Sequence, residues 1–414
     1  MAKLGINGGS PVMVSFDEGW PIIGAQEKAD IRQILELGRL GHVSQLLKDG
    51  ERVYNEEFRN AFARYYGVDY AIGAPNGSIA LELALRNAGI GPGDEVITPP
   101  TTWVATNIAP AMVGAKTVFV DVSPKNYCMD PARIEEAVTP RTKAIICVHL
   151  GGYPCEMDRI MQVADKHGLL VVEDCAQSHG SEYKGKLTGT WGHAGSFSFE
   201  ISKLMTAGEG GMSITSDSRL GDAVHGFCGE AGAQFEKAFA KPRKSIGWNY
   251  RMTEMQAALL LGQLGRLDAQ KQARMRSALY LNEELAKIDG IEPLEIHPGQ
   301  NFFSYLFKYE KEPFKGASKR TFLRAMTEEG MLLFSSASHQ APAYRSGYFH
   351  SAVNGDCSRI RLPVAERAFE EEAIGFRGTG ILLWDRERIA RIVEIVRKIA
   401  DNADELVRWE RENV

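Results

Sequence analysis

The sequence predicts an α/β fold built on a mostly parallel β-sheet, followed by a smaller α+β region. From about residue 70, short β-rich runs alternate with segments of helical length and periodicity. The β-rich runs are almost continuously apolar, as expected for strands buried on both faces between layers of helices. At 414 residues the chain has room for two domains. We expect a large domain over residues 1–255, of which about residues 1–25 can pack elsewhere, and a small domain over residues 256–414.

The apolar runs locate the strands of the expected sheet. The strands are expected at residues 70–73, 95–98, 117–121, 144–149 and 169–174. Segments with the length and apolar periodicity of helices lie between them, at residues 80–88, 103–113, 130–138 and 158–166. Near Gly195 this alternation ends. Residues 195–199 and 211–215 are expected to form two adjacent strands, joined by a segment that contains a lysine and several glycines.

The C-terminal part of the sequence has a different pattern. Residues 253–286 predict a long helical stretch with Thr253 as a possible N-cap, and this stretch would connect the large domain to the small one. Residues 302–309 are expected to form a strand. Residues 319–330 and 386–408 are expected to be helical.

Composition excludes several classes of protein. The net charge of −5, with 44% hydrophobic and 24% charged residues, is that of an ordinary globular protein and predicts neither nucleic-acid nor membrane binding. No run reaches the ~18 apolar residues of a membrane helix, and the N-terminus lacks the apolar core of a signal peptide. The six cysteines form no CxxC pair, and the nine histidines show no ligand spacing. We therefore expect a cytoplasmic protein with reduced thiols and no metal.

Lys203 is the strongest candidate for a chemical role. An isolated lysine is usually a solvated surface charge, but this one follows the aromatic run at residues 197–199 and precedes the glycines of residues 208–211, which would let the backbone pass close to a ligand. About thirty residues upstream, an apolar strand is expected to end at Asp174, with Glu173 on its opposite face. A lysine amine that can form a Schiff base, and a buried carboxylate that can pair with a protonated pyridine nitrogen, suit pyridoxal 5'-phosphate (PLP).

Further residues could complete such a site. The turn at residues 76–78 opens a helix whose first amides suit a phosphate, although many such turns only cap a helix. Trp103 could stack on a flat ring or simply pack between helix and sheet. Gln177 and His179 lie close enough to Asp174 in sequence to assist it or the ring. The hydroxyl of Ser198 could donate to a phosphate.

Together these motifs resemble the DegT/DnrJ/EryC1/StrS aminotransferase family, a branch of the fold-type I PLP enzymes. The motifs lie at residues 76–78, 101–106, 173–180, 197–211 and 249–258. The resemblance runs from about residue 17 to 300 and continues more weakly to the C-terminus. It implies a fold-type I PLP-dependent transferase, with a mostly parallel seven-stranded sheet in the large domain and a smaller C-terminal α+β domain.

The resemblance also implies roles around the cofactor ring. Lys203 would be the Schiff-base lysine, which takes a proton from the substrate's α-carbon and returns it to C4′ of the cofactor. Asp174 would be the partner of the pyridinium nitrogen. Gln177 would contact the side of the ring that carries the hydroxyl, and Trp103 would stack on the ring.

For the cofactor's phosphate, the resemblance implies a site shared between two chains. The backbone of Gly77 and Ser78, together with Ser198, would bind the phosphate. Asn249 would reach the phosphate of the neighbouring subunit's cofactor. This arrangement requires a homodimer with active sites shared across its interface.

Residues 173–180 and 203–211 look most similar to one subgroup of the family. It contains aminotransferases that act on keto-cyclitols such as scyllo-inosose, and the 3-amino-5-hydroxybenzoate synthases; more distant relatives aminate nucleotide-linked keto-sugars. Glu200, Ile201 and residues 376–380 depart from the subgroup's pattern, which bears on the acceptor. Weaker candidates for the substrate pocket are Tyr305, Ser335, Ser336, His339 and Arg377.

The expected function is a PLP-dependent aminotransferase. It would move an amino group from glutamine or glutamate to a keto-cyclitol or keto-sugar, in the biosynthesis of an aminoglycoside or a related secondary metabolite. One alternative is a PLP-dependent dehydratase or aromatising synthase of the 3-amino-5-hydroxybenzoate type, and the aromatising version keeps Lys203. Another is a non-catalytic regulatory protein with this fold, in which part of the set Lys203, Asp174 and Ser198 would have decayed.

Overall fold

The computed structural model contains a seven-stranded sheet with the strand order β1-β9-β8-β5-β4-β2-β3. It describes residues 3–41, 52–221, 249–331, 341–345, 349 and 357–414. The strands are β1 (Tyr70–Ala74), β2 (Glu95–Thr98), β3 (Lys116–Phe119), β4 (Thr142–Val148), β5 (Leu170–Asp174), β8 (Ala194–Ser198) and β9 (Gly211–Thr215). Neighbouring strands are parallel except at β9, which is antiparallel to both β1 and β8. The predicted α/β fold with a mostly parallel sheet is confirmed.

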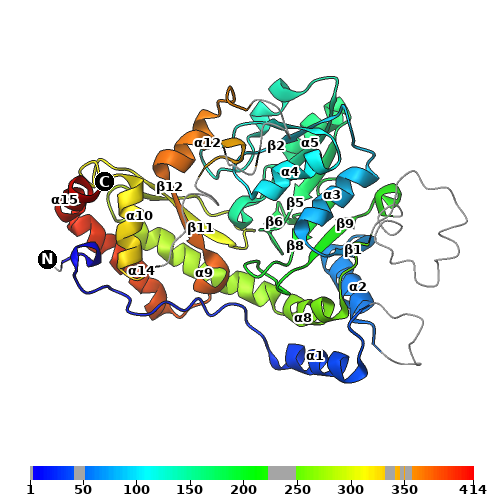
Figure 1. Cartoon of the computed structure of the whole chain (residues 1–414), viewed down its shortest axis with the longest axis horizontal. Helices are drawn as coiled ribbons and strands as arrows, with labels where there is room; N and C mark the ends of the chain where they lie inside the picture. The colour runs from blue at the N-terminus through cyan, green and yellow to red at the C-terminus, as the bar shows by residue number, and fades with distance from the viewer. Residues whose placement is uncertain (1–2, 42–51, 222–248, 332–340, 346–348, 350–356) are drawn as a thin grey trace, which may run out of the picture.

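Helices cover both faces of this sheet (Figure 1). They are α2 (Tyr54–Tyr66), α3 (Gly77–Asn87), α4 (Val104–Met112), α5 (Met157–His167) and α8 (Glu254–Leu264), and α1 (Ala25–Leu37) packs against α8. Successive strand residues point to opposite faces. Val171 therefore packs in a core cluster with residues of α5, whereas Val172 packs in another with residues of α3 and α4.

A second, three-stranded antiparallel sheet has the order β10-β11-β12. Its strands are β10 (Ile291–Pro293), β11 (Ser304–Tyr309) and β12 (Ala373–Arg377), and the helices near it are α9 (Leu267–Leu285), α10 (Lys319–Glu328), α14 (Arg386–Asp401) and α15 (Ala403–Asn413). Leu4 and Met13 belong to the same core cluster as residues of α9, α10 and α14, and the N-terminus lies beside these helices (Figure 1). The division into domains at residue 255 stays a prediction.

Short elements complete the described chain. They are the 3₁₀ turns η1 (Gly5–Asn7), η2 (Pro131–Arg133), η3 (Glu135–Ala137), η4 (Leu150–Gly152) and η5 (Ala343–Arg345), the π-helical turn η6 (Ala368–Glu372), the helices α12 (Pro363–Arg367) and α13 (Gly378–Ile381), and the hairpin strands β6 (Glu182–Tyr183) and β7 (Lys186–Leu187). Over the residues that the structure describes, no helix is both long enough and apolar enough to cross a membrane.

Three helix predictions need correction. Residues 130–138 form the two turns η2 and η3 instead of a helix: the Asp130 side chain accepts from the Ala132 amide at 2.9 Å, and the backbone is extended again at Val138. The stretch 253–286 is divided into α8 and α9 at Gly265, although Thr253 does cap α8 as expected. The stretch 386–408 is likewise divided into α14 and α15 at Asn402.

An aromatic cluster joins α2 to the strand that precedes Lys203. The ring centroid of Phe62 lies 5.1 Å from that of Phe197, 5.9 Å from that of Phe199 and 4.6 Å from that of Tyr66. All four side chains are buried. Since Phe197 and Phe199 flank Ser198, this packing holds the end of β8 in place.

We expect Phe62→Ala to lower the free energy of unfolding by about 3–5 kcal/mol, because it removes a fully buried ring and leaves a cavity. Urea-induced unfolding followed by circular dichroism would measure the change. The exposed Arg64 of the same helix provides the control, and Arg64→Ala should change stability by no more than about 0.5 kcal/mol. Equal losses in the two variants would contradict the importance of this cluster.

Candidate functional site

A cavity of about 670 Å³ lies between the carboxyl ends of β5 and β8 and the strands β11 and β12. The carboxyl edge of a parallel sheet is the usual place for a ligand in open α/β folds. Seven of the eight predicted site residues line this cavity: Gly77, Ser78, Trp103, Asp174, Gln177, Ser198 and Lys203. Asn249 is exposed and is not among the residues that line it.

Asp174 is a buried carboxylate with hydrogen bonds but no cationic partner. Its Oδ2 accepts from Thr106 Oγ1 at 2.6 Å and its Oδ1 accepts from the Ala176 amide at 3.0 Å. Burial raises the pKa of Asp174, although both hydrogen bonds and the charge of Lys203 oppose this shift. No Lys, Arg or His of the described residues forms an ion pair with it. A protonated ring nitrogen would supply the missing cation.

Lys203 follows β8 in a turn that its own amide closes on the carbonyl of Glu200 at 2.9 Å. Its Nζ lies 4.6 Å from the ring centroid of Phe303. Burial lowers the pKa of Lys203 and the Arg377 charge lowers it further, while Glu200 and Asp174 raise it. The shift favours the neutral amine, which is the form that can attack a carbonyl.

The N-terminus of α3 lies against β8. Asn76 caps this helix by accepting from the Ile79 amide at 2.9 Å, whereas the amides of Gly77 and Ser78 have no partner within the described part of the chain. A Cβ on Gly77 would lie 2.6 Å from the Cβ of Ser198, so only glycine permits this approach. Two amides at the positive end of a helix, beside a serine hydroxyl, fit a phosphate group.

The side-chain amide of Gln177 has a defined orientation. Its Oε1 accepts from the Gly151 amide at 2.8 Å. Because a backbone N–H can only donate, this contact identifies the oxygen and leaves Nε2 as a donor. Such a donor fits the ring hydroxyl of PLP. Trp103, the residue before α4, is 55% exposed and lines the cavity, so it is not buried between helix and sheet.

The weaker candidates are distributed differently. Arg377 lines the cavity and forms an ion pair with Glu18 at 3.0 Å. Tyr305 is buried and donates to Asn282 at 2.7 Å, outside this cavity. His179 is not a lining residue; its ring contacts Phe197 and Phe199, and burial together with the Lys203 charge lowers its pKa to about 3. Ser335, Ser336 and His339 lie outside the described residues.

The sequence reasoning did not assign a role to several residues of the site. Thr106 belongs to the motif at residues 101–106, and nothing in that motif indicated its bond to Asp174. Gly151 and Phe303 come from turns remote in sequence. No local signal marks such residues, because their contacts depend on how distant segments pack.

We expect Lys203→Met to stabilise the ligand-free protein at about pH 7 by roughly 0.5–2 kcal/mol, because it removes a cation whose desolvation is unfavourable. Folding lowers the pKa of Lys203 below its ordinary value of 10.5. Between the folded and unfolded pKa values the unfolded chain binds more protons, so the unfolding free energy of the unmodified protein rises with pH there. The advantage of the variant should shrink over the same interval.

Urea unfolding of both proteins, without added cofactor, at about pH 7 and about pH 10.5 would test this expectation. If the unfolding free energies of the two proteins changed equally with pH, Lys203 would not be desolvated in the fold. Lys28 of α1 gives a control because it is exposed, and Lys28→Met should leave the pH dependence of the unfolding free energy unchanged.

Comparison with known proteins identifies the family. Residues 22–374 match the DegT/DnrJ/EryC1/StrS aminotransferase family. A Micromonospora echinospora protein, provisionally named L-glutamine:3-amino-2,3-dideoxy-scyllo-inosose aminotransferase, is 36% identical over 421 residues, which cover 97% of each chain. L-glutamine:2-deoxy-scyllo-inosose aminotransferase of Streptoalloteichus tenebrarius is 33% identical over 427 residues, 97% of this chain and 99% of that protein.

A solved structure is similar over nearly the same length. The crystal structure of 3-amino-5-hydroxybenzoic acid synthase superposes with a TM-score of 0.77 at 29% sequence identity, covering 94% of this chain and 98% of that one. The family match spans every motif of the cavity from residue 76 to residue 211. The chain belongs to the DegT/DnrJ/EryC1/StrS aminotransferase family and is a PLP-dependent aminotransferase.

Proposed function

We propose that this aminotransferase moves the amino group of glutamine to a keto-cyclitol, in the biosynthesis of an aminoglycoside or a related secondary metabolite. The observation that carries the proposal is the near full-length similarity to two relatives whose names join L-glutamine to an inosose ketone. We therefore propose glutamine, and not glutamate, as the amino donor.

The charges around the cavity support a neutral acceptor. Glu200 and Glu209 line the cavity in addition to Asp174. Glu200 is held by Ser202, whose hydroxyl donates to Oε2 at 2.5 Å and whose amide donates to it at 3.0 Å. A nucleotide-linked sugar carries a diphosphate that needs unpaired cations. Arg377, one of the two cations among the described residues of the lining, is paired with Glu18, so a polyol ring suits this lining better.

PLP, when bound, supplies the electron sink that stabilises negative charge at the substrate's α-carbon. The residues around the cofactor would bind it and orient it. Asp174 would hold the ring nitrogen protonated, and Nε2 of Gln177 would donate to the ring oxygen. The amides of Gly77 and Ser78 would hold the phosphate at the positive end of α3.

Lys203 would move the proton. Its neutral amine, favoured by burial, takes the proton from the substrate's α-carbon and delivers it to C4′ of the cofactor. Phe303, 4.6 Å from Nζ, covers one side of this amine with an apolar ring. Exclusion of water there limits loss of the proton to solvent.

The aromatising synthase remains the second candidate. The observation that favours it is the structural similarity to 3-amino-5-hydroxybenzoic acid synthase. Both candidates use the same cofactor residues, and Lys203 is present in either case. Only the identity of the acceptor and product distinguishes them.

We also propose that the chain acts as a cytoplasmic homodimer with a large domain over residues 1–255 and a small domain over residues 256–414. Trp103 and Ile201 are 55% and 47% exposed in the single chain, and exposed apolar side chains of this size suit an interface. Asn249, exposed and outside the cavity, would reach the partner's phosphate site. The described cysteines are all free thiols, as in a reducing compartment.

We expect the PLP-loaded protein to transfer the label of [α-amino-¹⁵N]glutamine to 2-deoxy-scyllo-inosose, detected by mass spectrometry of the aminocyclitol. The kcat/KM for this ketone should exceed that for a nucleotide-linked keto-sugar by at least about 100-fold, because a diphosphate would find carboxylates instead of free cations. Formation of 3-amino-5-hydroxybenzoate from an aminated cyclic precursor, without labelled aminocyclitol, would favour the synthase. Label transferred only to the nucleotide-linked sugar would overturn the proposed acceptor.

Lys203→Ala should lower kcat by at least about 10³-fold while the protein still binds the cofactor, because the α-carbon proton would have no acceptor. Stopped-flow absorbance of the glutamine half-reaction would measure this loss. Lys184→Ala, at an exposed ion pair with Asp158, is the matched control and should retain the unmodified rate. A variant at Lys203 with normal turnover would show that another residue moves the proton.

A further inference from the structure

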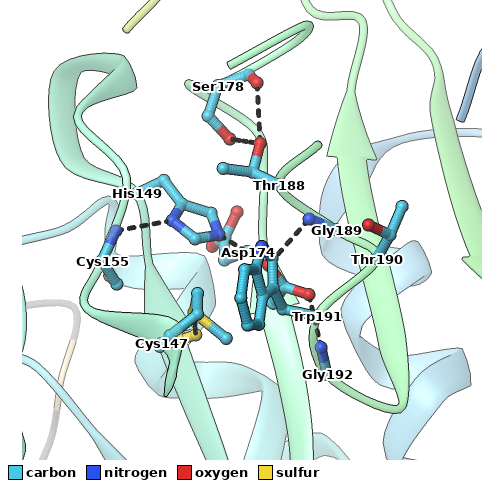
Figure 2. Close-up of polar contacts among 12 residues, drawn as sticks. Cys147, His149, Cys155, Asp174, Ser178, Thr188, Gly189, Thr190, Trp191 and Gly192 are labelled. Carbon is cyan, nitrogen blue, oxygen red and sulfur yellow. Dashed lines mark hydrogen bonds and ion pairs between the residues drawn. The ribbon is translucent and has the colours of Figure 1, made fainter. Parts of the chain in front are cut away.

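A group of buried polar side chains lies behind the cavity, on the other face of β5. His149, Glu173 and Cys175 are fully buried, and their potential ligand atoms lie within 4.8 Å of one another. Figure 2 shows the polar contacts around His149, which directly follows β4, and the loop between β7 and β8 that carries Gly189 and Gly192. Residue types of this kind, so close together, suggest a metal site.

Hydrogen bonds already occupy both ring nitrogens of His149 and both carboxylate oxygens of Glu173. The Nδ1 of His149 accepts from the Cys155 amide at 3.0 Å, so Nε2 carries the hydrogen and donates to Oε2 of Glu173, also at 3.0 Å. The carboxylate accepts from the amides of Gly189 and Gly192 as well, each at 2.7 Å. His149 has no lone pair left for a metal, so His149 and Glu173 form a hydrogen-bond network instead of a pair of metal ligands.

This network leads back to the cofactor cavity through one turn. His149 lies between β4 and η4, and η4 contains Gly151. The bond from the Cys155 amide to Nδ1 closes the loop that carries η4. The Gly151 amide then donates to Oε1 of Gln177 at 2.8 Å. That contact defines which end of the Gln177 amide is left to donate.

We propose that His149 is a positioning residue for Gln177, and that Glu173 sets the ring tautomer on which this positioning depends. Glu173 can only accept, so it requires the hydrogen on Nε2 and leaves the Nδ1 lone pair for Cys155. A residue that does not touch the ligand, but fixes the tautomer of a neighbouring histidine, commonly controls how a ligand-binding side chain is oriented. This inference rests on the proposed contact between Gln177 and the cofactor.

Loss of the Nδ1 acceptor has a defined consequence. The Cys155 amide would be buried without a partner, which is unfavourable enough to rearrange the loop. Gly151 would then move relative to Gln177, whose amide could rotate and present its oxygen to the ring. Cofactor affinity would fall although neither His149 nor Glu173 lines the cavity.

The test is a double-mutant cycle read as the dissociation constant of PLP, measured by equilibrium titration. His149→Gln keeps a donor for Glu173 but removes the acceptor for Cys155, and should weaken binding about tenfold. Gln177→Ala should weaken it to a similar degree, and the double variant no further than either single one. His149→Asn, whose oxygen replaces Nδ1, should stay within about threefold of the unmodified protein.

His193 provides a matched control. Like His149, it accepts a backbone amide at Nδ1. The donor is Val171 of β5, at 3.0 Å, near the end of the strand that lies away from Asp174. His193→Gln removes an equivalent bond and should lower stability without any coupling to Gln177. Coupling of equal size at His193 would mean that the effect at His149 is general loosening of the fold, which would overturn the inference.

Additive effects of His149→Gln and Gln177→Ala would also overturn it, while leaving the proposed cofactor contact in place. If Gln177→Ala bound PLP as tightly as the unmodified protein, Gln177 would not contact the cofactor and the inference would fail. The proposed reaction would still be tested separately, by labelled amino transfer in the unmodified protein. A second measurement, hydrogen exchange of the backbone amides, uses the unmodified protein and so does not depend on whether a variant folds. The Gly151 and Cys155 amides should exchange as slowly as those of β5, and rapid exchange would contradict the inference.

Discussion

The alternation of side chains at the carboxyl end of β5 is the constraint on which the rest of the site depends. Glu173 and Asp174 are consecutive, so a strand must send them to opposite faces of the sheet. Asp174 meets the cavity on the face of α3 and α4, and Glu173 meets His149 on the face of α5. A shift of one residue in the register of β5 would exchange them and destroy both environments.

The cavity holds buried groups whose charged forms a bound cofactor would stabilise. Burial raises the pKa of Asp174 and lowers that of Lys203, so each charged form is disfavoured in the protein alone. The first amides of α3 find no acceptor within the described ranges. A molecule with a cationic ring nitrogen, a reactive carbonyl and a phosphate satisfies all three at once. The unfavourable burial of these charges and the fit to PLP therefore have the same origin.

Much of this arrangement could be predicted from sequence, because it lies in local patterns. An apolar run marked the strand that ends at Asp174, and the aromatic pattern at residues 197–199 marked the next strand, expected over residues 195–199 and found at Ala194–Ser198. Lys203 was recognisable from this aromatic run before it and the glycines after it. The prediction failed at residues 130–138, where apolar periodicity alone does not reveal an Asx turn at Asp130. The bond from Thr106 to Asp174 and the link from His149 to Gln177 depend on contacts between segments far apart in sequence, so no local pattern indicated them.

Covalent mapping of the cofactor tests the central claim most directly. The PLP-loaded protein would be reduced with borohydride, digested and analysed by mass spectrometry to locate the phosphopyridoxyl group. The account predicts the group on Lys203, and its loss in a variant that lacks this lysine. Attachment to another lysine, or a cofactor that remains extractable after reduction, would contradict the proposed active site and the assignment of Asp174 as the partner of the ring.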